Sequence, residues 1–163
     1  MSKIRLFILA GLSVLVTLLV VYLVYGYNRY PNMPFKCTTF TVYDLSSDRQ
    51  TLILRLSQDL RLQDRDSGYF LVKGTTLSQG TTSVVNRMLN LKEGEQVDSD
   101  TYRYRISDVT KSPNDTLSDA LFEQWLSEIT TRPGVFQIDV VKGPANSWLI
   151  GSPVSFLFTC RSY

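Results

Sequence analysis

The sequence predicts a mainly β fold with one helix: an N-terminal transmembrane helix followed by an antiparallel curved sheet, or a lipocalin-like barrel or half-barrel, of about eight strands. Three observations predict it. An uncharged apolar run opens the chain, most of the remainder alternates apolar and polar residues with a period of two, and one segment has the period of an amphipathic helix. The chain has 163 residues, which is room for one domain of ordinary size.

The apolar run covers residues 6–25 and contains no charged residue. At 1.5 Å per residue, a helix of this length spans about 30 Å, the thickness of a bilayer core. Lys3 and Arg5 precede the run, which favours a cytoplasmic N-terminus. A cleaved signal peptide is the alternative, but its apolar region usually has ~7–15 residues. We therefore expect a cytoplasmic tail at 1–5, a transmembrane helix at 6–25, a tether at 26–35 and a periplasmic β-rich domain at 36–163.

The longest predicted strand covers residues 52–62, where leucines recur at every second position and Gln58 alone interrupts them. Shorter alternating runs predict the other strands, at residues 38–43, 69–76, 83–91, 102–107, 135–141, 147–150 and 154–160. Turn-forming residues separate these runs, for example Glu93-Gly94 after residue 91.

The segment 116–129 departs from this pattern, because Leu117, Leu121, Phe122, Trp125 and Ile129 form a helical stripe. Capping residues precede it and Pro133-Gly134 follow it. We expect this helix to pack on the sheet or to plug one end of a barrel. The aromatic residues Trp125, Phe136, Phe156 and Phe158 either line a cavity for a small apolar ligand or belong to the core.

Cys37 opens the folded part and Cys160 lies near its end. There is no Cys-x-x-Cys pair, and two cysteines are too few for a structural zinc site. In an extracytoplasmic domain, two cysteines predict one disulfide, which here would join the first strand to the last. In a cytoplasmic chain they would instead be two separate buried thiols, so the disulfide and the topology depend on each other.

Composition excludes several functions. The chain has no histidine, which excludes Ser-His-Asp and Cys-His catalysis and His-ligated zinc. From Leu6 onward the basic and acidic residues balance at 15 each, whereas a nucleic-acid-binding protein usually shows a basic excess. No catalytic motif is present either. We expect no enzymatic activity, no cofactor, no metal and no direct contact with nucleic acid.

An acid-sensing loop is a further hypothesis, in which Glu93, Glu95, Asp98 and Asp100 take up protons. Without histidine, a response at pH 5–6 needs carboxyl groups whose pKa values are raised by burial or by like-charged neighbours. The alternative is an ordinary solvated loop that senses nothing.

Several stretches resemble a known family. They are FKC at 35–37, TYRYRISDVTKSPNDTLSDALFEQWL at 101–126 and SWLIGSPVSFLFTC at 147–160, together with the N-terminal apolar run. They resemble the FidL-like family of small enterobacterial inner-membrane proteins, which is similar in layout to MyfF, PsaF and the ToxS-type accessory proteins.

This resemblance implies a partner: a ToxR-type regulator with one membrane span, a cytoplasmic winged helix and a periplasmic domain. The chain would bind that periplasmic domain as a heterodimer and stabilise or gate it, in the control of fimbrial or virulence genes. The resemblance carries over no catalytic residue, and only Cys37 and Cys160 as a pair. The alternative function is a periplasmic lipocalin-like carrier or chaperone for a small apolar ligand.

Overall fold

The computed structural model describes residues 2–27, 33–48, 50–152 and 156–163. The chain divides into two compact units, Met1–Pro31 and Asn32–Tyr163. Residues 28–32 of the tether predicted at 26–35 lie outside the described residues. Residues 154 and 155 of the predicted last strand lie outside them as well.

The first unit is the helix α1 (Ser2–Tyr27), which contains the whole predicted apolar run. The run within this helix has no charged residue, and its described side chains Leu12, Leu15 and Leu18 are all more than half exposed. In the described part of the chain, no helix combines the length and the apolar character needed to cross a membrane.

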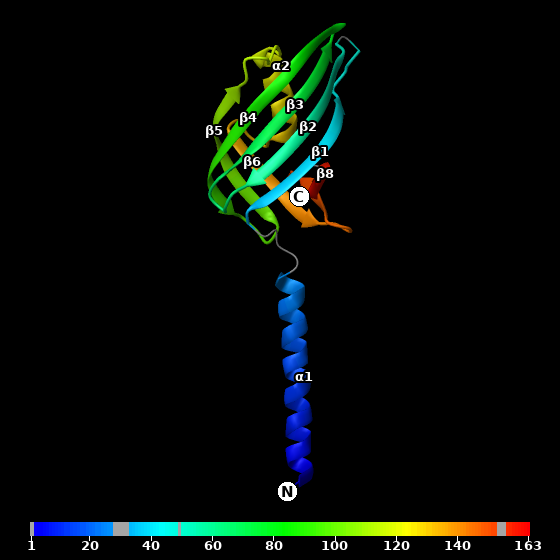
Figure 1. Cartoon of the computed structure of the whole chain (residues 1–163), viewed down its shortest axis with the longest axis vertical. Helices are drawn as coiled ribbons and strands as arrows, with labels where there is room; N and C mark the ends of the chain where they lie inside the picture. Colours follow the sequence, from blue (N-terminus) through cyan, green and yellow to red (C-terminus); the bar gives the residue numbers. More distant parts are fainter. Residues whose placement is uncertain (1, 28–32, 49, 153–155) are drawn as a thin grey trace. The chain divides into compact units, whose positions relative to one another are not determined.

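The second unit is a closed antiparallel barrel in which each strand pairs with the next along the chain (Figure 1). Its strands are β1 (Phe35–Asp44), β2 (Leu52–Leu62), β3 (Gly68–Ser78), β4 (Thr81–Gln96), β5 (Thr101–Lys111), β6 (Val135–Lys142), β7 (Ser147–Gly151) and β8 (Phe156–Ser162). The predicted fold class is therefore confirmed for this unit, in its closed form.

The period-two pattern explains the barrel core. In β2 the side chains at 52, 54, 56, 60 and 62 are fully buried, while those between them face outward. Gln58, the polar interruption, is buried as well. Its amide nitrogen donates a 2.8 Å hydrogen bond to the hydroxyl of Tyr43, and its amide oxygen accepts one from Thr41. A polar side chain is thus tolerated inside the barrel because its hydrogen bonds are made there.

The barrel closes where β1 meets β8, a junction that we call the seam. β2 pairs with β1 along ten residues, but among the described residues β8 pairs with it only at Cys37↔Ser162 and Thr38↔Arg161. The disulfide between Cys37 and Cys160 bridges the seam at this end, with its Cα atoms 5.5 Å apart. The predicted disulfide is thus confirmed. It reinforces the seam, which is the shortest strand pairing among the described residues of the barrel.

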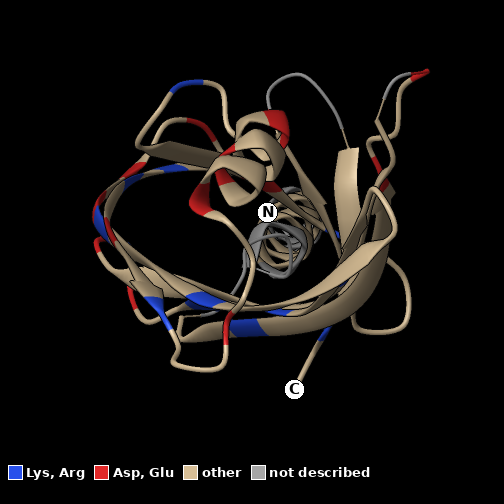
Figure 2. Ribbon diagram, turned by 90° about the horizontal axis from the view of Figure 1, so that it is seen from above, with Lys and Arg blue, Asp and Glu red and all other residues tan. Residues whose placement is uncertain are grey.

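The helix α2 (Asp119–Ile129) lies at the upper end of the barrel in Figure 1, and Figure 2 shows it across that end from above. Phe122, Trp125 and Ile129 are buried, and the Trp125 ring meets the ring of Tyr43 edge-on at 5.9 Å. The helix begins later than the predicted residue 116. Thr116 and Leu117 instead donate backbone hydrogen bonds to the Val84 carbonyl of β4, and Ser118 caps the helix.

The predicted turn at Glu93-Gly94 is wrong, because β4 continues through it to Gln96. Glu93 adopts a positive φ of 53° within a β-bulge, and the Gly94 amide donates to the Asp66 carbonyl. A Cβ at position 94 would lie 2.0 Å from the Arg65 carbonyl oxygen, so glycine is needed for close packing rather than for a turn. The chain turns after Gln96 instead.

Candidate functional site

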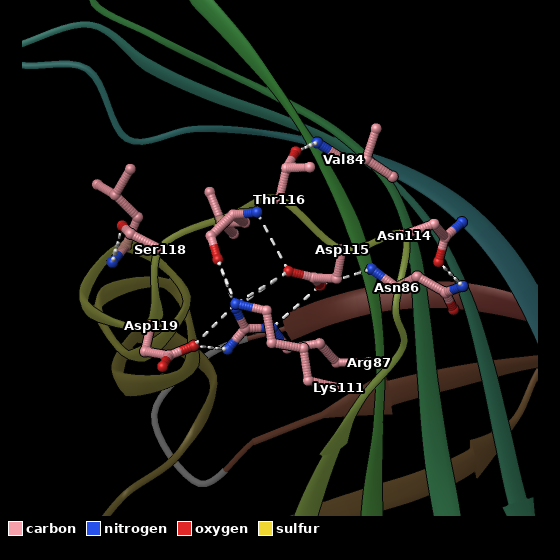
Figure 3. A network of polar contacts seen from close by, with 11 residues as sticks. Val84, Asn86, Arg87, Lys111, Asn114, Asp115, Thr116, Ser118 and Asp119 are labelled. Carbon is pink, nitrogen blue, oxygen red and sulfur yellow. Dashed lines mark hydrogen bonds and ion pairs between the residues drawn. The ribbon is translucent and has the colours of Figure 1, made fainter.

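The densest polar cluster of the barrel surrounds the side chain of Arg87, which β4 points inward beneath α2 (Figure 3). Its guanidinium contacts both carboxylate oxygens of Asp115, at 3.1 and 3.2 Å, and donates to the Leu117 carbonyl at 2.7 Å. It also pairs with Asp119 at 2.9 Å and stacks over the Phe122 ring at 4.4 Å. One buried cation therefore connects β4 to the segment that leads into α2 and to α2 itself.

Asp115 is the anionic centre of this cluster, and its side chain is inaccessible to solvent. Burial raises the pKa of Asp115, but hydrogen bonds from Arg87 and from the backbone amide of Asn86 outweigh it and lower the pKa below its ordinary value. The carboxylate also accepts from the Leu117 amide at 3.1 Å. Lys111 approaches it at 3.6 Å from the more exposed side. The arrangement fixes a loop; it does not leave Asp115 free to exchange a proton near neutral pH.

Sequence reasoning missed this cluster, since Arg87 and Asp115 are 28 residues apart. A signal was present in β4, where Arg87 occupies an inward position between Val85 and Leu89. A charged residue at such a position indicates a buried partner.

The four aromatic residues considered as cavity or core lining do not lie together. Trp125, Phe136 and Phe158 are buried in the barrel core. Phe70 joins the latter two, with ring centroids 5.4 Å from Phe136 and 6.1 Å from Phe158. Phe156, at the beginning of β8, is 59% exposed and lies outside the core. The sequence predicts that Phe156 lines a cavity or belongs to the core, but its side chain lies on the surface.

A pocket of about 490 Å³ lies beside the C-terminal half of α2 and is formed by a different set of side chains. Its described lining residues are Glu123, Leu126, Ser127, Thr130, Thr131, Arg132, Pro133 and Gly134. None of the four aromatic residues is among them. The mixed lining offers hydroxyl groups, one acid and one base around a small apolar patch.

Of the four acidic residues of the loop hypothesis, the two glutamates lie at the bulge in β4 and are each paired with an arginine, and the two aspartates lie beyond the end of the strand. Both carboxylate oxygens of Glu93 bind the Arg105 guanidinium, and Glu95 pairs with Arg103. The hydrogen bond from Arg105 lowers the pKa of Glu93, the opposite of the direction that acid sensing requires. Asp98 and Asp100 lie in the following turn, where Asp98 accepts a hydrogen bond from the Ser99 amide. Glu93 is therefore stabilised as a carboxylate by a neighbouring cation, and repulsion between carboxylates does not raise its pKa.

Apolar side chains gather on the outer face of the strands around the seam. Phe40 and Val42 of β1 are 66% and 52% exposed. Val141 of β6 and Leu149 of β7 are also exposed and face each other directly in the β6–β7 register. Thr159 of β8 pairs with Leu149, and its carbonyl accepts a 2.7 Å hydrogen bond from the Thr39 hydroxyl of β1. β8 thus connects the strands that carry these two pairs of apolar side chains. We call Phe40, Val42, Val141 and Leu149 the seam patch.

Comparison with known proteins yields one match. The family described as "FidL-like putative membrane protein" matches residues 74–160, slightly more than half of the chain. The matched region contains both members of the buried pair, Arg87 and Asp115, and the whole of α2. No curated protein and no solved structure matches the chain.

Proposed function

Because this chain belongs to the FidL-like family, we propose that it is a membrane-anchored periplasmic accessory protein of a ToxR-type transmembrane transcription regulator. In this proposal the barrel binds the regulator's periplasmic domain and stabilises or gates it. The regulated genes would be of the fimbrial or virulence type. The chain itself performs no catalytic step and does not contact nucleic acid.

The observation that carries the proposal is the seam patch. Monomeric soluble proteins seldom expose several large apolar side chains on neighbouring strands, because water solvates such a surface poorly. Here Phe40, Val42, Val141 and Leu149 lie on the outer face of a barrel whose interior is occupied by its own side chains. A surface of this kind supports a role in binding another protein.

The anchor in this proposal is α1. A helix that is apolar on all sides is not stable alone in water and needs a partner or a lipid environment. The described side chains from Leu12 to Leu23 are largely exposed, and the apolar run in the sequence is long enough for a bilayer core. With Lys3 and Arg5 before the run, the barrel would lie in the periplasm and the N-terminus in the cytoplasm.

The test is co-purification of the full chain with the full-length regulator from detergent-solubilised membranes. We expect the two proteins to elute together, and a regulator whose periplasmic domain is replaced by an unrelated one to elute without the chain. Regulator abundance should also fall when the chain is deleted. Equal recovery of the chain with both forms of the regulator would contradict the proposal.

A second candidate function is the binding of a small apolar ligand. It is favoured by the pocket beside α2 and by three buried polar atoms of the barrel, Thr76 Oγ1, Tyr104 Oη and Trp125 Nε1, which have no hydrogen-bond partner among the described residues. Titration of the purified full chain with fatty acids or bile salts, in the absence of any regulator, tests it. Saturable binding would support the second function, and unchanged Trp fluorescence together with no heat of binding would exclude it.

A further inference from the structure

The edge of β1 is paired along only part of its length on the side of the seam. After Thr38 no β8 residue is in register with β1 among the described residues, and Thr39 reaches β8 through its side chain rather than its backbone. Among the described residues, 40–44 therefore have β2 on one side and no paired strand on the other, which leaves an open main-chain edge there. Such an edge presents backbone N–H and C=O groups to an incoming strand.

A second incompletely paired edge in the barrel shows how such an edge is normally protected. β6 pairs with β5 only at residues 101–105, and the remainder of β5 extends beyond it. The exposed side chains there are polar: Asp108, Thr110 and Lys111. Charged and polar residues on an edge disfavour the addition of another strand. The β1 edge carries Phe40 and Val42 at two of its three outward positions and a charge only at its end, Asp44, so most of it lacks this protection.

The charged side chains around the open edge indicate which kind of strand would bind there. Arg55 lies opposite Val42 on β2, Lys36 is exposed on β1 and Arg161 is exposed on β8. Within the described residues, none of these three cations forms an ion pair with an acid. Of the nearby acids, Asp59 is paired with Arg61, while Asp44 at the end of the edge accepts from the Ser46 amide and keeps its negative charge. The surface beside the open edge is therefore apolar, and its cations outnumber its unpaired acid.

We propose that residues 40–44 of β1 accept an extended, acidic strand from the regulator's periplasmic domain, which joins the barrel wall by main-chain pairing. This proposal rests on the proposed function and specifies its interface. Apolar side chains of the incoming strand cover Phe40 and Val42, and its acidic side chains pair with Arg55, Lys36 and Arg161. A second copy of this chain fits less well, because a two-fold contact through this face brings like charges together.

The experiment compares hydrogen exchange in the full chain alone and in its purified complex with the full-length regulator. Residues 40–44 should become protected in the complex, whereas residues 106–111 on the protected β5 edge should exchange at the same rate in both samples. The double variant Phe40→Lys/Val42→Lys should lower recovery of the regulator about tenfold or more. Val97→Lys is the matched control, an exposed valine in the turn between β4 and β5, neither of which pairs with β1 or β8, and it should bind normally.

Both variants alter outward-facing side chains, and formation of the Cys37–Cys160 disulfide on non-reducing gels verifies that each has folded. A complex in which residues 40–44 stay unprotected and the lysine variants still bind would overturn this inference and leave the proposed function intact. Protection of residues 40–44 at high concentration without the regulator would assign the edge to a second copy and overturn it as well. Failure of the wild-type chain to bind any regulator would instead refute the proposed function.

Discussion

The hydroxyl of Tyr163 donates a 2.7 Å hydrogen bond to the carboxylate of Asp59, although 104 residues separate them. Since β1 lies between β8 and β2, this contact passes over β1 on the outside of the barrel. The Arg61 guanidinium, which binds Asp59, also stacks against the Tyr163 ring at 5.6 Å. One end of the seam is thus held by a disulfide and by this outer contact, while the other end is open.

The disulfide should contribute much more to stability than the Tyr163 contact. We expect Cys37→Ser and Cys160→Ser each to lower the free energy of unfolding by about 4–5 kcal/mol, because both release a loop of 123 residues in sequence. The double variant should add nothing further. Tyr163→Phe removes one exposed hydrogen bond and should cost about 1 kcal/mol or less.

Urea denaturation measures these differences, and thiol labelling of the native protein provides the control. Two thiols that react fully before reduction would show that the bond is not formed. Unequal effects of the two single variants would mean that one cysteine has a separate role in packing.

Arg87 should be the most sensitive charged residue of the barrel. Arg87→Met leaves Asp115 buried without its main counter-ion, which typically costs about 3–5 kcal/mol. Arg87→Met/Asp115→Asn should be less destabilised than Arg87→Met alone, since the amide keeps an acceptor for the Asn86 and Leu117 amides without a buried charge. Lys111→Met is the control, because Lys111 is 42% exposed and should contribute less than about 1 kcal/mol.

The measurement is again the free energy of unfolding, at pH 7. Additive effects of the Arg87 and Asp115 substitutions would contradict direct coupling between the two side chains.

Stability should be lost in acid rather than gained. The pKa of Asp115 is lowered in the folded state, so its contribution is fully present above its unfolded pKa of about 4 and is lost as the pH falls through the folded pKa. Unfolding free energy should therefore be nearly constant from pH 5 to 8 and fall below about pH 4. Asp115→Asn should lower stability at pH 7 and make the decline in acid shallower.

The loop of Glu93, Glu95, Asp98 and Asp100 offers an independent check. The pKa of Glu93 is also lowered, so protonation of Glu93 in acid costs stability. Glu93 therefore cannot stabilise the protein or its complex near pH 5–6. The variant Glu93→Gln/Glu95→Gln/Asp98→Asn/Asp100→Asn should bind the regulator with the same pH profile as the wild type between pH 5 and 8. A shift of that profile would restore the acid-sensing hypothesis.

Gly74 should not tolerate a side chain. A Cβ at this position would lie 1.9 Å from the Arg55 carbonyl oxygen, within the β2–β3 pairing that the backbone cannot easily open. We expect Gly74→Ala to destabilise the barrel by about 3 kcal/mol. At Gly80 nothing lies within 4 Å of such a Cβ, so Gly80→Ala should cost only the strain of its positive φ, about 1 kcal/mol. Thermal unfolding of both variants distinguishes the two effects.

Topology can be tested with reporter fusions. Alkaline phosphatase fused after residue 40 should be active, because that enzyme folds only outside the cytoplasm, whereas a reporter active only in the cytoplasm should be silent at the same position. The expectation follows from Lys3 and Arg5 before the apolar run. The reverse pattern would refute the proposed anchor and the periplasmic location together.

The strands could be predicted from sequence because a half-buried strand has a period of two wherever one face meets the core. This held for β2, and Trp125 and Ile129 identified α2 in the same way from the helical period. The ends were less predictable, since they depend on contacts with distant residues. Thr116 bonds to Val84 rather than starting the helix, and Gly94 continues a strand because Asp66 accepts its amide hydrogen.

The candidate sites were harder to predict than the fold. The Arg87–Asp115 pair arises where the segment before α2 packs on β4, and the open β1 edge arises where β1 meets β8; the alternation of residues specifies neither contact. The alternation that buries Phe158 would also place Phe156 inward, but the β7–β8 register shifts between Ile150 and Gly151, and Phe156 is exposed.

The order of the strands has a consequence for biosynthesis. Every pairing in the barrel joins neighbours along the chain except that of β1 with β8. Hairpins can therefore form progressively as the polypeptide emerges, but Cys37 must wait for the final strand before it meets Cys160. A chain interrupted before β8 keeps a reactive thiol at Cys37 and an uncovered β1, two features by which quality-control thiol oxidoreductases and proteases can distinguish an unfinished barrel from a complete one.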